Sequence, residues 1–144
     1  MIEQDTIRLL RECDSGVKMG ISSIDDVIDN VTSKELKCFL SKSKEKHSEL
    51  SKEIDALLSK YHDEGKEPGP MLKGMSWIKT NVKLAVDYSD NTIADLMTDG
   101  CNMGIKSLSK YLNEYAAADE KSKDITKKLI KIEEDLSNQL RDYL

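Results

Sequence analysis

The sequence predicts an all-α protein, a four-helix bundle built from two repeated helical hairpins that a long, helix-containing crossover joins. Three observations carry this prediction. Apolar residues recur at intervals of three and four over most of the chain, which is the periodicity of amphipathic helices. A nine-residue segment that begins at Gly16 recurs in similar form at Gly100, an offset of 84 residues. The 2 prolines both lie between these two copies, at Pro68 and Pro70.

The repeated segment places glycines four residues apart inside a helical pattern, with a methionine between them. Glycine in a helix interior costs about 1 kcal/mol relative to alanine, so a compensating interaction is needed. We expect close approach of two helices, the arrangement that this spacing gives in membranes, with a ligand or metal against the bare backbone as the alternative. The predicted close-packing residues are Gly16, Gly20, Gly100, Gly104, Met19 and Met103.

The first hairpin is expected over residues 3–64. Its first helix runs from about Asp5 to Asn30, and its second begins at about Ser33. Between them Thr32 and Glu35 have the spacing of a capping box, in which a hydroxyl caps the helix and a carboxylate follows three residues later. A turn of two or three residues makes the two helices antiparallel.

The crossover is expected over residues 65–90 and the second hairpin over 91–144, so that 1–144 form a single domain. The crossover contains the only tryptophan, Trp77, on a short amphipathic segment. Asp90 is the predicted cap of the next helix, which runs to about Tyr115, and Asp119 is the predicted cap of the last one. A helix of about 26 residues is about 39 Å long, so a crossover of this length returns the chain along the bundle.

Composition argues against several classes of function. The formal net charge is −5, and a nucleic-acid-binding protein needs a basic surface. The clusters of lysines at 42–46 and 121–128 are interleaved with acidic residues, which is typical of solvated helix faces. No apolar run approaches the ~18 residues of a membrane span, and no secretory signal precedes the first helix. The 3 cysteines form no CxxC pair, so we expect a cytoplasmic protein with its cysteines in the core.

The predicted arrangement of helices also resembles that of a known superfamily. Paired hairpins with one long crossover resemble the ferritin-like superfamily. The run Lys-Gly-Met-Ser-Trp-Ile-Lys at 73–79, followed by a glycine-containing helix and Tyr111, is similar to an uncharacterised bacterial branch of it. The resemblance implies a ferritin-like bundle. A ferritin-like metal centre also needs Glu-x-x-His on two helices, and this chain has Lys44 before His47 and Ser59 before His62. We therefore expect no di-iron centre and no other cofactor.

His47 and Glu133 are the most informative pair of polar residues. His47 falls on the inner stripe of its helix, and the repeat pairs it with Glu133. We favour a structural hydrogen bond between them; the alternative is part of an iron or manganese site. Two ligands alone do not close a metal site. The methionines are interpreted as adaptable core residues in preference to ligands of Cu(I) or haem iron.

The sequence contains no nucleophile–base pair, phosphate-binding loop or acid dyad, so no catalytic residue is predicted. The function that we expect is that of a non-catalytic binding or structural module, which associates with itself as a homodimer or with a protein partner. Nucleic acid and membrane are not expected as partners. The alternative is a divergent ferritin-like metal-binding protein or oxidoreductase.

Overall fold

The computed structural model describes residues 2–63 and 89–144, which form four α-helices and two short 3₁₀ helices. The α-helices are α1 (Ile2–Val27), α2 (Lys34–Lys60), α5 (Asp90–Glu114) and α6 (Glu120–Leu140). The 3₁₀ helices are η1 (Ile28–Asn30), which extends α1, and η2 (Arg141–Tyr143), which ends α6. The described part of the chain contains no strand, so the all-α prediction is confirmed.

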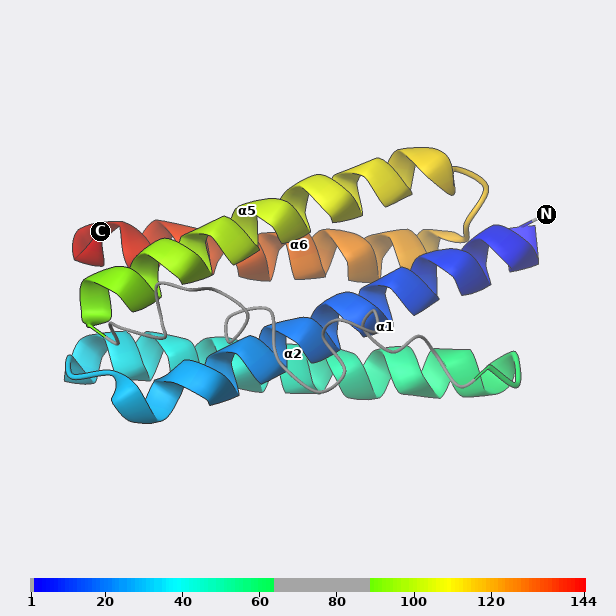
Figure 1. The fold of residues 1–144 in the computed structure, drawn as a ribbon. Helices are drawn as coiled ribbons and strands as arrows, with labels where there is room; N and C mark the ends of the chain where they lie inside the picture. Colours follow the sequence, from blue (N-terminus) through cyan, green and yellow to red (C-terminus); the bar gives the residue numbers. More distant parts are fainter. Residues whose placement is uncertain (1, 64–88) are drawn as a thin grey trace.

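The helices form a bundle in which each hairpin is antiparallel and α2 runs parallel to α5. Figure 1 shows that α2 ends at one end of the bundle and that α5 begins at the other, beside the start of α2. A simple up-down-up-down bundle places these two termini together. The end of α2 and the start of α5 are therefore separated by the length of the bundle. The predicted crossover, with Trp77 and both prolines, lies almost wholly outside the described residues.

Three helices begin at a residue whose side chain caps the backbone. Ser33 accepts a hydrogen bond from the backbone N–H of Leu36, and Ser89 accepts one from Thr92. Asp119 caps α6 in the same way, which confirms the prediction for that helix. The predictions of Thr32 and Asp90 as caps were each wrong by one residue. In both cases the adjacent serine has the extended backbone that an N-cap requires.

Asp90 has a different role, because it joins the two hairpins. Its carboxylate oxygens accept hydrogen bonds from the backbone N–H groups of Thr32 and Ser33, both at 2.8 Å. At the other end of the bundle, the α5–α6 turn donates two backbone N–H groups to the first turns of α1, at Asp5 and Thr6. Each hairpin turn is thus fixed by the first turn of a helix in the other hairpin.

The interior consists of two apolar clusters, one toward each end of the bundle. The first surrounds the α1–α2 turn and includes Ile24, Leu36, Leu40, Ile93, Leu96, Leu136 and Leu140. The second surrounds the α5–α6 turn and includes Leu10, Val17, Leu50, Ile54, Leu58, Leu108, Ile125 and Leu129. Between the two clusters, at the middle of the bundle, lie His47 and Glu133. Both clusters are apolar and the pair between them is polar, and further polar side chains such as Asp14 and Thr126 are also buried.

Two further expectations can be compared with the structure. Cys13 and Cys101 are buried as expected, but Cys38 is exposed because it lies on the outer face of α2. Within residues 2–63 and 89–144, no helix is both long enough and apolar enough to cross a membrane.

Candidate functional site

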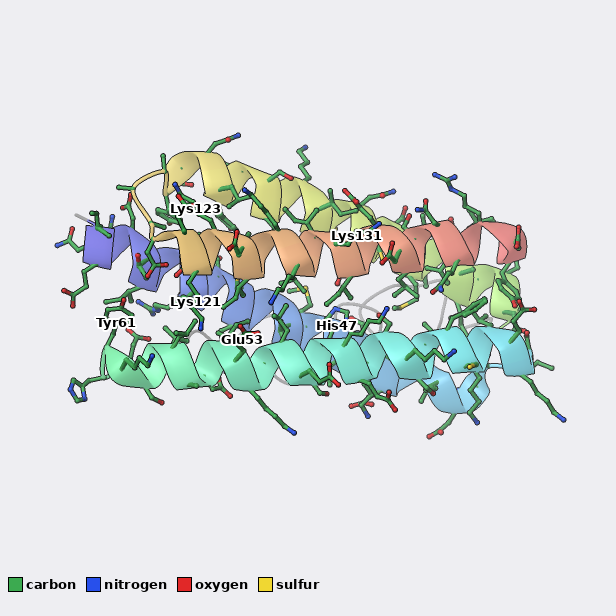
Figure 2. All side chains as sticks on the ribbon, turned by 180° about the vertical axis from the view of Figure 1, so that it is seen from behind. His47, Glu53, Tyr61, Lys121, Lys123 and Lys131 are labelled. Atoms are coloured by element: carbon green, nitrogen blue, oxygen red, sulfur yellow. The ribbon has the colours of Figure 1, made fainter. Side chains whose placement is uncertain are left out.

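The centre of the bundle holds a buried histidine between two acceptors. His47 on α2 is 1% exposed. Its Nδ1 lies 2.7 Å from the carbonyl oxygen of Ser43, and its Nε2 lies 2.6 Å from Oε1 of Glu133 on α6. Figure 2 shows His47 in the space between α2 and α6. The predicted pair therefore meets directly, across an interface between helices of different hairpins.

These contacts determine where the protons lie. A carbonyl oxygen can only accept, so Nδ1 carries a hydrogen and Nε2 faces the carboxylate. Burial alone lowers the pKa of His47. The hydrogen bond and negative charge of Glu133, together with the Ser43 carbonyl, outweigh burial and raise the pKa above its usual value. The structure thus favours an imidazolium–carboxylate pair that is neutral as a whole.

Cys101 on α5 adds a thiol to this pair. Its pKa is raised well above the usual range, first by burial and then by the charge of Glu133 and a hydrogen bond to that carboxylate. A thiol in this environment stays protonated and acts as a donor. Because the thiolate is the nucleophilic form of cysteine, this geometry disfavours a nucleophilic role for Cys101.

Gly20 is explained by His47. An added Cβ at Gly20 would lie 2.6 Å from Nε2 and 2.7 Å from Cδ2 of the imidazole, closer than real contacts allow. At Gly16 the nearest atom would be Leu129 Cδ2 at 3.6 Å, and at Gly104 it would be Glu133 Cγ at 3.8 Å, which are ordinary contacts. The neighbours of these glycines are thus side chains of α2 and α6. We expected instead that the two glycine-containing helices, α1 and α5, would approach each other closely there.

A groove lies between α1 and α5 at the level of the glycines. Its volume is about 200 Å³, and its floor is formed by Leu129 and Glu133 of α6. The walls carry all four glycines of the repeat with Ser15, Met19, Ser23, Met97, Met103, Ser107, Leu108 and Tyr111. The glycines keep the groove open, because larger side chains at these positions would fill it.

The groove has a characteristic charge. Among the residues that the structure describes, its lining includes two carboxyl side chains, Glu12 and Glu133, and no lysine or arginine. Glu133 is hydrogen-bonded to His47. Glu12, which also interacts with another group, is the first groove residue on α1 and marks one end. Because α1 and α5 run in opposite directions, Tyr111 lies at the same end.

The two methionines of the repeat differ in their surroundings. Met19 is partly buried and lines the groove. Met103 also lines the groove but is 50% exposed, so the close packing predicted for it is not found. Met103 lies on the rim of the groove.

The residues do not fit the metal site that the ferritin-like resemblance would imply. An ion bound to both His47 Nε2 and Glu133 Oε1 at about 2 Å would need these atoms more than about 3 Å apart, and they are 2.6 Å apart. Among residues 2–63 and 89–144, no group of three or more His, Cys, Asp or Glu side chains is arranged to hold a metal.

Four lysines of α6 line a second, more open hollow on the opposite face. Lys121, Lys127, Lys128 and Lys131 lie there with Glu53 and Asp124. Figure 2 shows Lys121 and Glu53 between α6 and α2. Lys131 is paired with Asp135 at 2.9 Å, so acidic residues accompany the lysines as the sequence indicated.

Sequence reasoning missed Cys101 and Glu12 as members of the site. Cys101 was interpreted as a small core residue, and Glu12 is one of many acidic residues of a charged chain. No local pattern distinguishes either of them. Cys101 approaches Glu133 because α5 packs against α6. Glu12 becomes a groove residue because α1 and α5 leave a groove between them.

Fold and site together define a helical bundle with a groove in one face and a closed polar network beneath it. No known protein family matches the chain by sequence, and no curated protein does so either. The fold is similar to that of a crystal structure of a DUF305 fragment from Deinococcus radiodurans, with a TM-score of 0.72 and 9% sequence identity. The match covers 96% of this chain and 93% of that one. At this identity the likeness shows the fold alone, and no family match confirms the ferritin-like resemblance.

Proposed function

We propose that this protein is a non-catalytic binding module whose binding site is the groove between α1 and α5. The observation that carries this proposal is that glycines keep a cavity of about 200 Å³ open where side chains would otherwise pack. Four helical glycines together cost about 4 kcal/mol, a large part of the stability of a domain. Of these, Gly20 is required by His47, while Gly16 and Gly104 have room for a Cβ. Maintenance of the groove accounts for these two.

The polar groups beneath the groove support binding over catalysis. His47 has both ring nitrogens engaged, and Cys101 holds its proton next to Glu133. A general base or a nucleophile needs a free acceptor or a thiolate at the surface of the site. This network instead holds three helices at a fixed spacing below the groove.

The test is a titration with a neutral apolar probe, 1-octanol, followed by the methyl NMR signals of Met19 and Met97. We expect saturable shifts of both signals. Ser15→Leu places a large side chain in the groove and should abolish the shifts, while Ser22→Leu, on the same helix but outside the groove, should leave them unchanged. Equal behaviour of the two variants would contradict the proposal.

Association is the second candidate function. The half-exposed Met103 on the rim of the groove favours it, because a thioether is well suited to adaptable contacts with another chain. In this case the partner is a second copy of the chain or another protein, and the acidic net charge argues against nucleic acid. Light scattering over a range of concentrations tests self-association. A monomer at all concentrations would exclude the homodimer.

A further inference from the structure

We infer that a proton controls the groove, which accepts an apolar ligand while His47 is an imidazolium and rejects that ligand once His47 has lost its proton. This inference rests on the proposed function and concerns how binding at the same site is regulated.

The surroundings of His47 require a hydrogen on each ring nitrogen. Nδ1 lies 2.7 Å from the carbonyl oxygen of Ser43, and Nε2 lies 2.6 Å from Oε1 of Glu133. A carbonyl and a carboxylate only accept hydrogen bonds, whereas a neutral imidazole carries one hydrogen. The Ser43 hydroxyl lies 3.5 Å from Nδ1, too far for a good replacement bond. Release of the proton to solvent therefore sets two acceptors against each other on one side of the ring.

Glu133 is the side chain that can respond to this contact. The imidazole is 1% exposed and lies against Gly20, where an added Cβ would be 2.6 Å from Nε2. Glu133 is 13% exposed and lines the groove. At Gly104 an added Cβ would still be 3.8 Å from Oε2 of Glu133, so space remains between this glycine and the carboxylate. Without its imidazolium partner, the carboxylate turns into that space and thus into the groove.

The other titratable groups near the pair do not produce the same change. Cys101 on α5 lies beside Glu133, and burial together with the charge of Glu133 raises its pKa, so this thiol keeps its proton at neutral pH. On α1 the residue against the ring is Gly20, which does not titrate. Glu12, the other carboxyl of the groove lining, lies about 12 Å farther along α1. His47 is therefore the group whose titration changes the charge at the floor of the groove.

That charge decides whether an apolar ligand is accepted. With its proton the pair of His47 and Glu133 is neutral as a whole, and an apolar chain can cover it. Without the proton the pair carries one negative charge, and a ligand that covers it takes a carboxylate out of water without a cationic partner. Binding of the ligand and binding of the proton therefore favour each other.

The test is a titration with 1-octanol at a series of pH values from about 6 to about 9, the range in which a histidine of raised pKa loses its proton. The methyl NMR signals of Met19 and Met97 report binding. We expect the affinity to fall about tenfold or more over this range. By reciprocity, saturation with 1-octanol should raise the pKa of His47, observed in its imidazole NMR signals, by about one or more.

A matched pair of variants identifies the charge. Glu133→Gln removes the carboxylate from the floor of the groove and should abolish the dependence of affinity on pH. Glu134→Gln removes the same charge at the neighbouring, exposed position of α6 and should retain this dependence. Circular dichroism at each pH confirms that the proteins are folded. The titration of His47 in the wild type tests the inference independently of both variants.

The outcomes separate the two proposals. If 1-octanol binds equally at every pH, or leaves the titration of His47 unchanged, the inference is wrong while the proposed function stands. A pH dependence that persists in Glu133→Gln also contradicts the inference. If 1-octanol shifts neither methyl signal at any pH, the groove is not a binding site and both proposals fail.

Discussion

Gly20 and Gly104 occupy equivalent positions in the repeat, yet their surroundings differ. His47 lies where a Cβ of Gly20 would be, while Glu133 leaves room for a Cβ at Gly104. The imidazole cannot move aside freely, because both of its nitrogens are hydrogen-bonded. Identical substitutions at the two glycines should therefore have opposite effects.

We expect Gly104→Ala to stabilise the protein by up to about 1 kcal/mol, because alanine is the better helix former. Gly20→Ala should destabilise it by about 1–3 kcal/mol, as overpacking of a core does. Urea unfolding of both variants measures these changes. In a His47→Ala background the overlap is absent, and Gly20→Ala should then be neutral or stabilising. If Gly20→Ala costs as much in that background, His47 is not the reason for the glycine.

The pair formed by His47 and Glu133 makes stability depend on pH. The pKa of His47 is raised in the folded protein, so the native state holds this proton more tightly than the unfolded chain. The stabilisation is complete below the ordinary histidine pKa of about 6.5 and is lost as pH rises through the higher, folded value.

Unfolding free energy should accordingly fall in the wild type as pH rises above about 6.5. His47→Gln should be less stable at about pH 6 and show a flatter profile over this range. Urea unfolding at a series of pH values measures both curves. Parallel profiles for the two proteins would mean that His47 does not hold the proton.

At the scale of elements, the hairpins are joined at their turns as well as through the core. Asp90 lies in the first turn of α5 and accepts two backbone N–H groups from the α1–α2 turn. The two hydrogen bonds involve a charged acceptor, and a carboxylate at the start of a helix also interacts favourably with the helix dipole. One side chain thus fixes the position of α5 on the first hairpin.

Asp90→Ala should cost about 1–3 kcal/mol, since it removes two hydrogen bonds to a charged group. Asp90→Asn keeps one accepting oxygen and should lose less. Asp99→Ala, at an exposed position of the same helix, is the control and should change stability by no more than about 0.5 kcal/mol. Urea unfolding compares the three variants. An equal loss for Asp90→Ala and Asp99→Ala would show that the contact to the turn contributes nothing.

At the scale of the whole molecule, the bundle has a buried histidine–glutamate pair between two apolar clusters. Ferritin-like proteins place metal ligands from four helices in a bundle core. Here the corresponding space holds His47 and Glu133 in direct contact, without the distance that a shared ion requires.

Protein purified without a histidine tag should therefore hold no stoichiometric iron or manganese. Elemental analysis by mass spectrometry measures the content, and addition of EDTA should leave the melting temperature unchanged. Two equivalents of iron or manganese per chain, lost in the His47→Ala/Glu133→Ala double variant, would overturn this expectation. The alternative of a divergent metal-binding protein would then become the better one.

Much of this fold could be predicted from the sequence, because helical periodicity and antiparallel turns are local properties. The described helices begin and end within a few residues of their predicted limits. The pair His47–Glu133 was predicted through the repeat, since a residue near the axis of two similar hairpins lies close to its own equivalent. The internal repeat itself remains an interpretation of the sequence.

The caps were less predictable, because adjacent residues compete for the same role. Thr32 and Ser33 are both good cap residues, as are Ser89 and Asp90, and the backbone conformation of the turn decides between them. The contact between Asp90 and the first hairpin joins residues 57 and 58 positions apart, and no sequence pattern marks it.

The sequence alone determined that the chain forms long amphipathic helices, that these helices pair as two hairpins, and that the glycines of each copy of the repeat share one face of a helix. Only the tertiary structure decided what those glycines do. A helical wheel gives the direction in which a glycine points but not what lies opposite. Whether that space holds another backbone, an imidazole or a groove depends on how far apart the helices pack, and the side chains of all four helices set that distance together.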